Sequence, residues 1–190
     1  LGHDTSIPGW PWVAGTHPWL EPTAAAMLVL CQNGLGAHRR TQDGIRLVLD
    51  RAIPGGGWNM GNSIVFGRTL RPQAGPTGMA LLALRAAGQN RSPRVMKACR
   101  YLAGTLPGTR AAESLGWGLL GLAAWGARPA DADQWLAESF GRALGLEHSP
   151  SRLSMLLLAA GVLTPALLGV EPAEMDVDTE RMTRVGTRSR

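Results

Sequence analysis

Acid–base side chains stand directly before the first strongly apolar segment of the chain. His17 lies four residues before Glu21, and Glu21 precedes Pro22 at the start of an expected helix. A histidine in contact with a carboxyl group can do acid–base work, and a carboxyl group with a raised pKa at a cavity mouth can act as a general acid. In the structural alternative, the charge of Glu21 only complements the positive N-terminal end of the helix. Both interpretations stay open.

Six tryptophans are candidates for ligand contact through the faces of their rings. Four lie in loops or at helix starts and two lie in an apolar segment: Trp10, Trp12, Trp19 and Trp58, then Trp117 and Trp125. Aromatic faces attract cations and stack on apolar groups. The alternative is that the loop tryptophans stack on helix ends and the other two pack in the core. The two cysteines, Cys31 and Cys99, lack the spacing of a zinc site, so we predict neither a metal nor a cofactor.

A short internal repeat in the sequence predicts how these residues are positioned. Pro22-Thr23 opens an apolar run that closes at Gly34, and Pro76-Thr77 opens a second that closes at Gly88. An internal repeat of this kind decides the architecture. Apolar helices are expected at 23–31, 77–87, 115–125 and 151–163, and amphipathic helices, which cover a core, at 39–53, 93–106 and 132–144.

Alternating apolar and amphipathic helices predict an all-α fold of stacked αα-hairpins. The expected arrangement has about seven helices, with the apolar helices in one layer and the amphipathic helices in the other. Residues 1–170 form a single repeat domain that curves into a partial or small α/α toroid, and residues 171–190 form a polar tail. A helical bundle with a central layer is the alternative.

Charge and hydropathy limit the classes of partner. The formal net charge is +5, and a net positive charge attracts anions. No basic–aromatic platform or nucleic-acid motif is present, so no nucleic-acid partner is expected. Residues 153–170, LSMLLLAAGVLTPALLGV, carry no charge and form either a buried core helix or a helix in contact with a membrane. The expected location is cytoplasmic, or membrane-associated as part of a complex.

The tryptophan loops resemble a known repeat. GWPW at 9–12 followed by WLEPT at 19–23, and GGGWNMGN at 55–62, are similar to the repeat of squalene–hopene cyclases and protein prenyltransferase β subunits. The resemblance extends from about residue 9 to residue 163 and includes bacterial proteins with the prenyltransferase and squalene oxidase repeat. It implies an α/α toroid whose inner helices surround a cavity for an isoprenoid. This chain holds about half of the helices of a complete toroid.

The family's catalytic motifs are poorly matched here. Its cyclases protonate an alkene with a DxDD-type motif, and the nearest match here is Asp176-Val177-Asp178-Thr179 in the polar tail. Asp178 is therefore a further candidate acid, in addition to Glu21 and His17. The zinc ligands of its prenyltransferases have no counterpart. We therefore expect an accessory, non-catalytic subunit that binds a partner protein, such as a second toroid half, or an isoprenoid-like lipid, with possible peripheral membrane contact. The alternative is an isoprenoid-acting enzyme, either a terpene cyclase or a prenyltransferase.

Overall fold

The computed structural model confirms an all-α fold with seven α-helices in the part of the chain that it describes, residues 2–146 and 149–161. A short 3-10 helix, η1 (Leu106–Gly108), and one small hairpin, β1 (Ile64–Val65) and β2 (Arg68–Thr69), complete it. The helices are α1 (Leu20–Gln32), α2 (Arg39–Asp50), α3 (Ala74–Ala86), α4 (Pro93–Thr105), α5 (Ala112–Ala124), α6 (Ala132–Leu146) and α7 (Pro150–Ala159).

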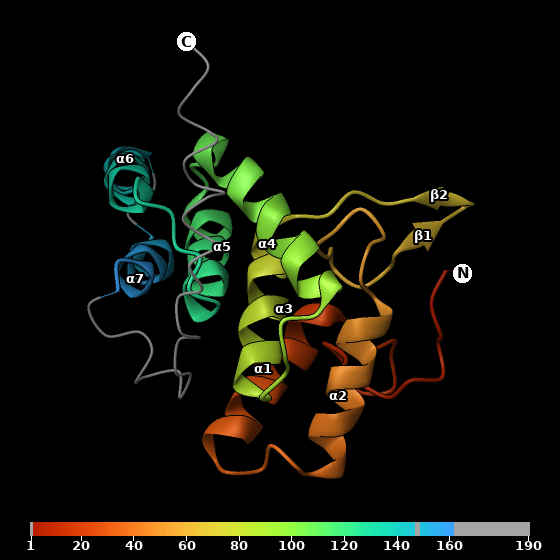
Figure 1. Cartoon of the computed structure of the whole chain (residues 1–190). Helices are drawn as coiled ribbons and strands as arrows, with labels where there is room; N and C mark the ends of the chain where they lie inside the picture. The colour runs from red at the N-terminus through yellow and green to blue at the C-terminus, as the bar shows by residue number, and fades with distance from the viewer. Residues whose placement is uncertain (1, 147–148, 162–190) are drawn as a thin grey trace.

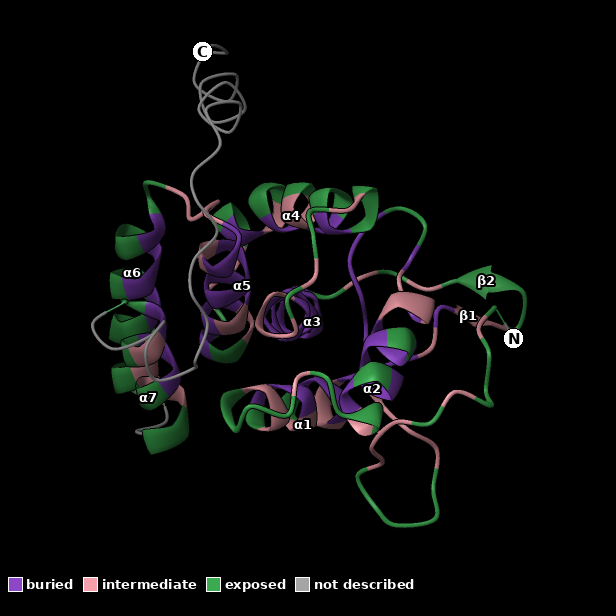
Figure 2. Cartoon of the chain, turned by 60° about the horizontal axis from the view of Figure 1, so that its bottom comes forward, coloured by how far each residue is buried: buried purple, intermediate pink, exposed green. Residues whose placement is uncertain are grey.

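The apolar helices form one layer and the amphipathic helices cover it. Contacts run from α1 to α3, from α3 to α5 and from α5 to α7, while α2, α4 and α6 pack on α1, α3 and α5 in turn (Figure 1). Helix α3 lies in the middle, with α1 and α4 on opposite sides of it (Figure 2). Among the described helices the row is open, with α1 and α7 at its ends, and the partial or small toroid stays a prediction.

Glycines bring the two central helices into backbone contact. A Cβ at Gly78 of α3 would lie 2.0 Å from the Trp117 carbonyl oxygen of α5, and one at Gly121 would lie 2.7 Å from the Cα of Gly78. Since neither position has room for a side chain, α3 and α5 pack at the shortest distance that the backbone allows. Eleven residues of α3 are buried.

The internal repeat of the sequence corresponds to a repeated set of hydrogen bonds, which we call the Gly-Trp lock. In the first lock, Thr23 Oγ1 accepts from the Trp10 amide at 2.9 Å and donates to the Trp10 carbonyl at 3.5 Å. In the second lock, Thr77 Oγ1 accepts from the Trp58 amide at 2.9 Å and donates to the Trp58 carbonyl at 3.1 Å. The preceding glycine is Gly9 or Gly57, where a Cβ would lie 2.8 Å from the threonine oxygen.

Each lock attaches a loop to the first turn of an apolar helix. The tryptophan carbonyl also accepts the amide of the N-cap residue, Trp19 at 3.1 Å and Gln73 at 2.8 Å. Pro22 and Pro76 therefore lie in the third helical position and the helices begin three residues before the predicted starts. Proline is tolerated there because first-turn amides have no partner within the helix.

Candidate functional site

Two carboxyl groups lie near each other at the N-terminal ends of two apolar helices. Glu21 lies in the first turn of α1 and Glu113 in the first turn of α5, and their charges interact. The first turn of α3 lies beside that of α5, because a Cβ at Gly75 would be 3.8 Å from the Cα of Ser114. The sequence predicted Glu21 at a helix start but gave no signal that Glu113, far along the chain, is close to it.

The environment of Glu21 favours its neutral form. Partial burial raises the pKa of the Glu21 carboxyl above its ordinary value, and the neighbouring Glu113 carboxylate raises it further. Desolvation and like charge both disfavour ionisation. Glu21 thus keeps its proton at a higher pH than an exposed glutamate does, as a proton donor requires.

A cleft of about 480 Å³ adjoins Glu113 at the same end of α5. Three arginines contribute to its walls, together with Glu113 and two serines: Arg110, Arg142, Arg152, Ser114 and Ser139. Arg110 is fixed in place, because its Nε lies 2.6 Å from the Glu138 carboxylate and its carbonyl accepts the Ser139 hydroxyl at 2.8 Å. Guanidinium groups bind carboxylates and phosphates, so the cleft suits an anionic ligand.

His17 does not pair with Glu21 in this structure. Its ring lies edge-on to Trp19, with centroids 5.7 Å apart, and 6.1 Å from the ring of His3. The amide of Trp19, two residues after His17, is bonded to the Trp10 carbonyl. Within the described chain, His17 and Glu21 form no ion pair. The expected acid–base pair is therefore replaced by two neighbouring histidines.

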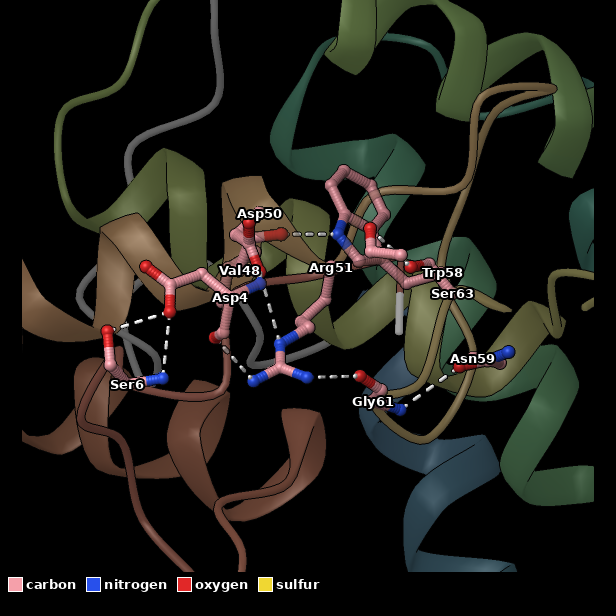
Figure 3. Close-up of polar contacts among 10 residues, drawn as sticks. Asp4, Ser6, Val48, Asp50, Arg51, Trp58, Asn59, Gly61 and Ser63 are labelled. Carbon is pink, nitrogen blue, oxygen red and sulfur yellow. Dashed lines mark hydrogen bonds and ion pairs between the residues drawn. The ribbon is translucent and has the colours of Figure 1, made fainter. Parts of the chain in front are cut away.

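A buried arginine, whose contacts Figure 3 shows, lies near these histidines. Arg51 is 1% exposed, donates to the carbonyls of Gly61 and Asp4 at 3.2 Å each, and has its Nε 3.4 Å from the Asp50 carboxylate. Burial is the main cause that lowers the pKa of both histidines, and the Arg51 charge adds to it. Arg51 lies off the apolar stripe of the amphipathic segment at 39–53, so the sequence gives no signal of this cluster, which depends on the N-terminal segment folding back.

The tryptophans fall into two groups. Trp58 and Trp125 are buried, and their indole N–H groups donate to the carbonyls of Val48 at 2.6 Å and Leu81 at 2.9 Å. Such bonds satisfy a buried donor, and here they attach the loop at Trp58 to α2 and the end of α5 to α3. The more accessible group has partly or largely exposed rings: Trp10, Trp12, Trp19 and Trp117. The cleft near Glu113 has none of the six in its walls.

The thiols and the remaining candidates add no further chemistry. Cys31 and Cys99 are half-buried free thiols, and burial raises the pKa of Cys99 to about 11, so it stays protonated at neutral pH. No group of three or more His, Cys, Asp or Glu side chains suited to a metal occurs among the residues described. Asp178 and the later part of 153–170 lie outside those residues.

Comparisons of the chain with protein-family models, with curated proteins and with solved structures give no match. The resemblance of the tryptophan loops to the cyclase and prenyltransferase repeat therefore stays a prediction. No helix in the described part is both long and apolar enough to cross a bilayer.

Proposed function

We propose that this protein is an accessory helical-repeat subunit that binds a partner protein along helix α1. The observation that carries the proposal is the exposed apolar side of α1. Glu21 is the only charged residue of this helix, yet Val29 is 58% exposed and Ala25 lies one turn before it on the same side. A helix that is apolar all round is normally covered all round.

Helix α3 has the same character and shows what full covering looks like. It is as uniformly apolar as α1, but it buries eleven residues where α1 buries five. The difference arises from position, because α3 has an inner-layer neighbour on both sides and α1 has one. A partner helix packed against Ala25 and Val29 would continue the row of apolar helices beyond α1. The partner protein would then occupy the position of the next helices of a toroid.

Native mass spectrometry of the complex purified from the source cells tests this proposal. We expect the wild-type chain to travel in a complex heavier than the monomer, and Val29→Arg to release it as a monomer. Leu144→Arg is the matched control, because Leu144 is a similarly exposed apolar residue on α6. A monomeric wild-type chain, or a complex that survives Val29→Arg unchanged, would contradict the proposal; a complex of two copies would identify the partner as the chain itself.

A second candidate function is an isoprenoid-acting enzyme, and the carboxyl pair favours it. Glu21, with its raised pKa, has the environment of a general acid, and its neighbour Glu113 lines the cleft that also has three arginines in its walls. Its test is turnover of a polyprenyl substrate. Glu21→Gln keeps the shape of the side chain and removes the proton donor, so a turnover rate that survives this substitution would exclude Glu21 as the acid.

A further inference from the structure

The charges of this protein are segregated along the sequence. No acidic residue occurs between Asp50 and Glu113, whereas the same segment holds nine basic residues: Arg51, Arg68, Arg71, Arg85, Arg91, Arg94, Lys97, Arg100 and Arg110. The whole chain has 19 basic and 14 acidic residues, so this segment carries the excess and the rest is net acidic.

Five of these cations are exposed on two neighbouring parts of the molecule, α4 and the segment on and after β2, which together we call the cationic face. Arg94, Lys97 and Arg100 are exposed on the outer side of α4, and Arg68 and Arg71 are exposed on and after β2. Within the described chain none of the five forms an ion pair, and only Lys97 uses its charged group in a hydrogen bond, to the Pro54 carbonyl at 3.3 Å. Their positive charge is therefore not neutralised by the protein.

Hydrogen bonds join the hairpin segment and α4 into one surface. The Tyr101 hydroxyl of α4 donates to the carbonyl of Pro72, next to Arg71, at 2.8 Å, and Lys97 holds the loop at 54–57. A pocket of about 280 Å³ opens between this loop and α4, with Arg94 and Lys97 in its walls and no acidic residue among them. Two cations around a small pocket suit a phosphate group.

An aromatic residue projects from this face. Phe66 is 99% exposed at the tip of the hairpin, which extends away from the helices (Figures 1 and 2). Its φ of 49° is left-handed, a conformation unfavourable for a bulky side chain, and Gly67 follows with a φ of 75°. Met96, 39% exposed, adds an apolar side chain among the cations of α4.

We propose that the cationic face docks on the surface of an anionic lipid bilayer, with Phe66 inserted between headgroups and a lipid phosphate in the pocket beside Arg94 and Lys97. Cations attract anionic headgroups, and exposed apolar side chains enter the interfacial region of a bilayer. The acid-free segment that carries these cations, together with Phe66 and Met96, therefore fits an anionic bilayer surface. A nucleic acid is a poorer fit, because the one other ring here, Tyr101, is half-buried and bonded to Pro72 and offers no stacking platform. Helix α4 lies across α3 from α1, and the hairpin extends beyond α2, so a partner on α1 would leave both accessible (Figure 2).

Sedimentation of the full chain with vesicles tests the proposal. We expect binding to phosphatidylcholine vesicles containing about a third phosphatidylglycerol, little binding to pure phosphatidylcholine, and loss of binding as salt rises. The double variant Arg94→Gln/Lys97→Gln is expected to weaken binding about tenfold or more. Phe66→Asn, which tolerates the left-handed conformation, is expected to weaken it as well without lowering Tm.

The control removes two exposed cations of α2 outside this face, Arg39→Gln/Arg46→Gln, and is expected to leave vesicle binding within about twofold of wild type. Equal binding to neutral and anionic vesicles, or an equal loss in the control, would overturn the proposal. It would also be overturned if the protein bound glycerol 3-phosphate but no anionic vesicle, since the ligand would then be a free phosphate, or if duplex DNA competed more strongly than the vesicles.

Discussion

The two Gly-Trp locks share a backbone pattern but differ in how their tryptophans are used. Trp58 is buried and bonded through its indole to α2, whereas Trp10 is half-exposed and lies under the guanidinium of Arg40 at 4.2 Å. Arg40 also donates to the Gly9 carbonyl at 2.8 Å, so a surface cation holds the first lock closed. The repeat therefore resides in the glycine, the threonine and the backbone, and the tryptophan ring adapts to a central or an edge position.

The largest effect is expected where α3 is most crowded. Gly78→Ala places a methyl group 2.0 Å from the Trp117 carbonyl and should lower the free energy of unfolding by about 3 kcal/mol or more, because neither backbone has room to move. On α1, at the end of the row, Ala25→Val adds atoms at an exposed position and should change the free energy of unfolding by about 0.5 kcal/mol or less. Urea unfolding of both variants measures the contrast, and equal losses would show that α1 is as constrained as α3.

The tryptophans provide the next contrast. Trp58→Phe removes the indole donor to Val48 and leaves space in the core, and it should lower the free energy of unfolding by about 2–3 kcal/mol. Trp10→Phe retains a ring beneath Arg40 and should lose less than about 1 kcal/mol. If chemical denaturation gave similar losses, the first tryptophan would be as structural as the second.

The threonines test the shared part of the locks. Thr77→Val leaves the Trp58 amide without its acceptor in a fully buried setting and should lower the free energy of unfolding by about 2 kcal/mol. Thr23→Val should lower it by about 1 kcal/mol, since the bonds of the first lock are only partly buried and water can replace them. Thermal unfolding of Thr→Ser variants at both positions is the control, because serine retains the hydroxyl.

The smallest contrast is a response to acid that is confined to the first lock. His17 stands directly before Pro18, where the second lock has Arg71 before Pro72. The fold lowers the pKa of His3 and His17 below 6.5, so the unfolded chain takes up protons first and stability is lost as pH falls below that value. The drop in Tm between about pH 7.5 and about pH 5 should be smaller in His17→Asn than in wild type. An unchanged drop would exclude His17 as its source.

The sequence predicted the elements better than the contacts between distant parts. Helix type followed from periodicity, because four segments are apolar all round and three are one-sided, and the structure has these seven helices. The hairpin was missed because its turn is Phe66-Gly67, whereas the usual signal for such a turn is Asn-Gly or Asp-Gly.

Among the candidate site residues, Glu21 was identified from its place before Pro22, but its neighbour Glu113 depends on how α1, α3 and α5 align. The histidine contact and the burial of Arg51 likewise require the N-terminal segment to return to α2. Such contacts between segments far apart in sequence leave no periodic signal.

Crosslinking from α1 most directly tests whether a partner covers this helix. A photoreactive amino acid is placed at Val29 or, for comparison, at Leu144, in the full chain in its source cells. We predict a discrete adduct of higher mass from position 29 and none from position 144. If position 29 gave no adduct, or both positions gave the same adducts, the exposed side of α1 would be ordinary surface and the account of this protein as an accessory subunit would fail.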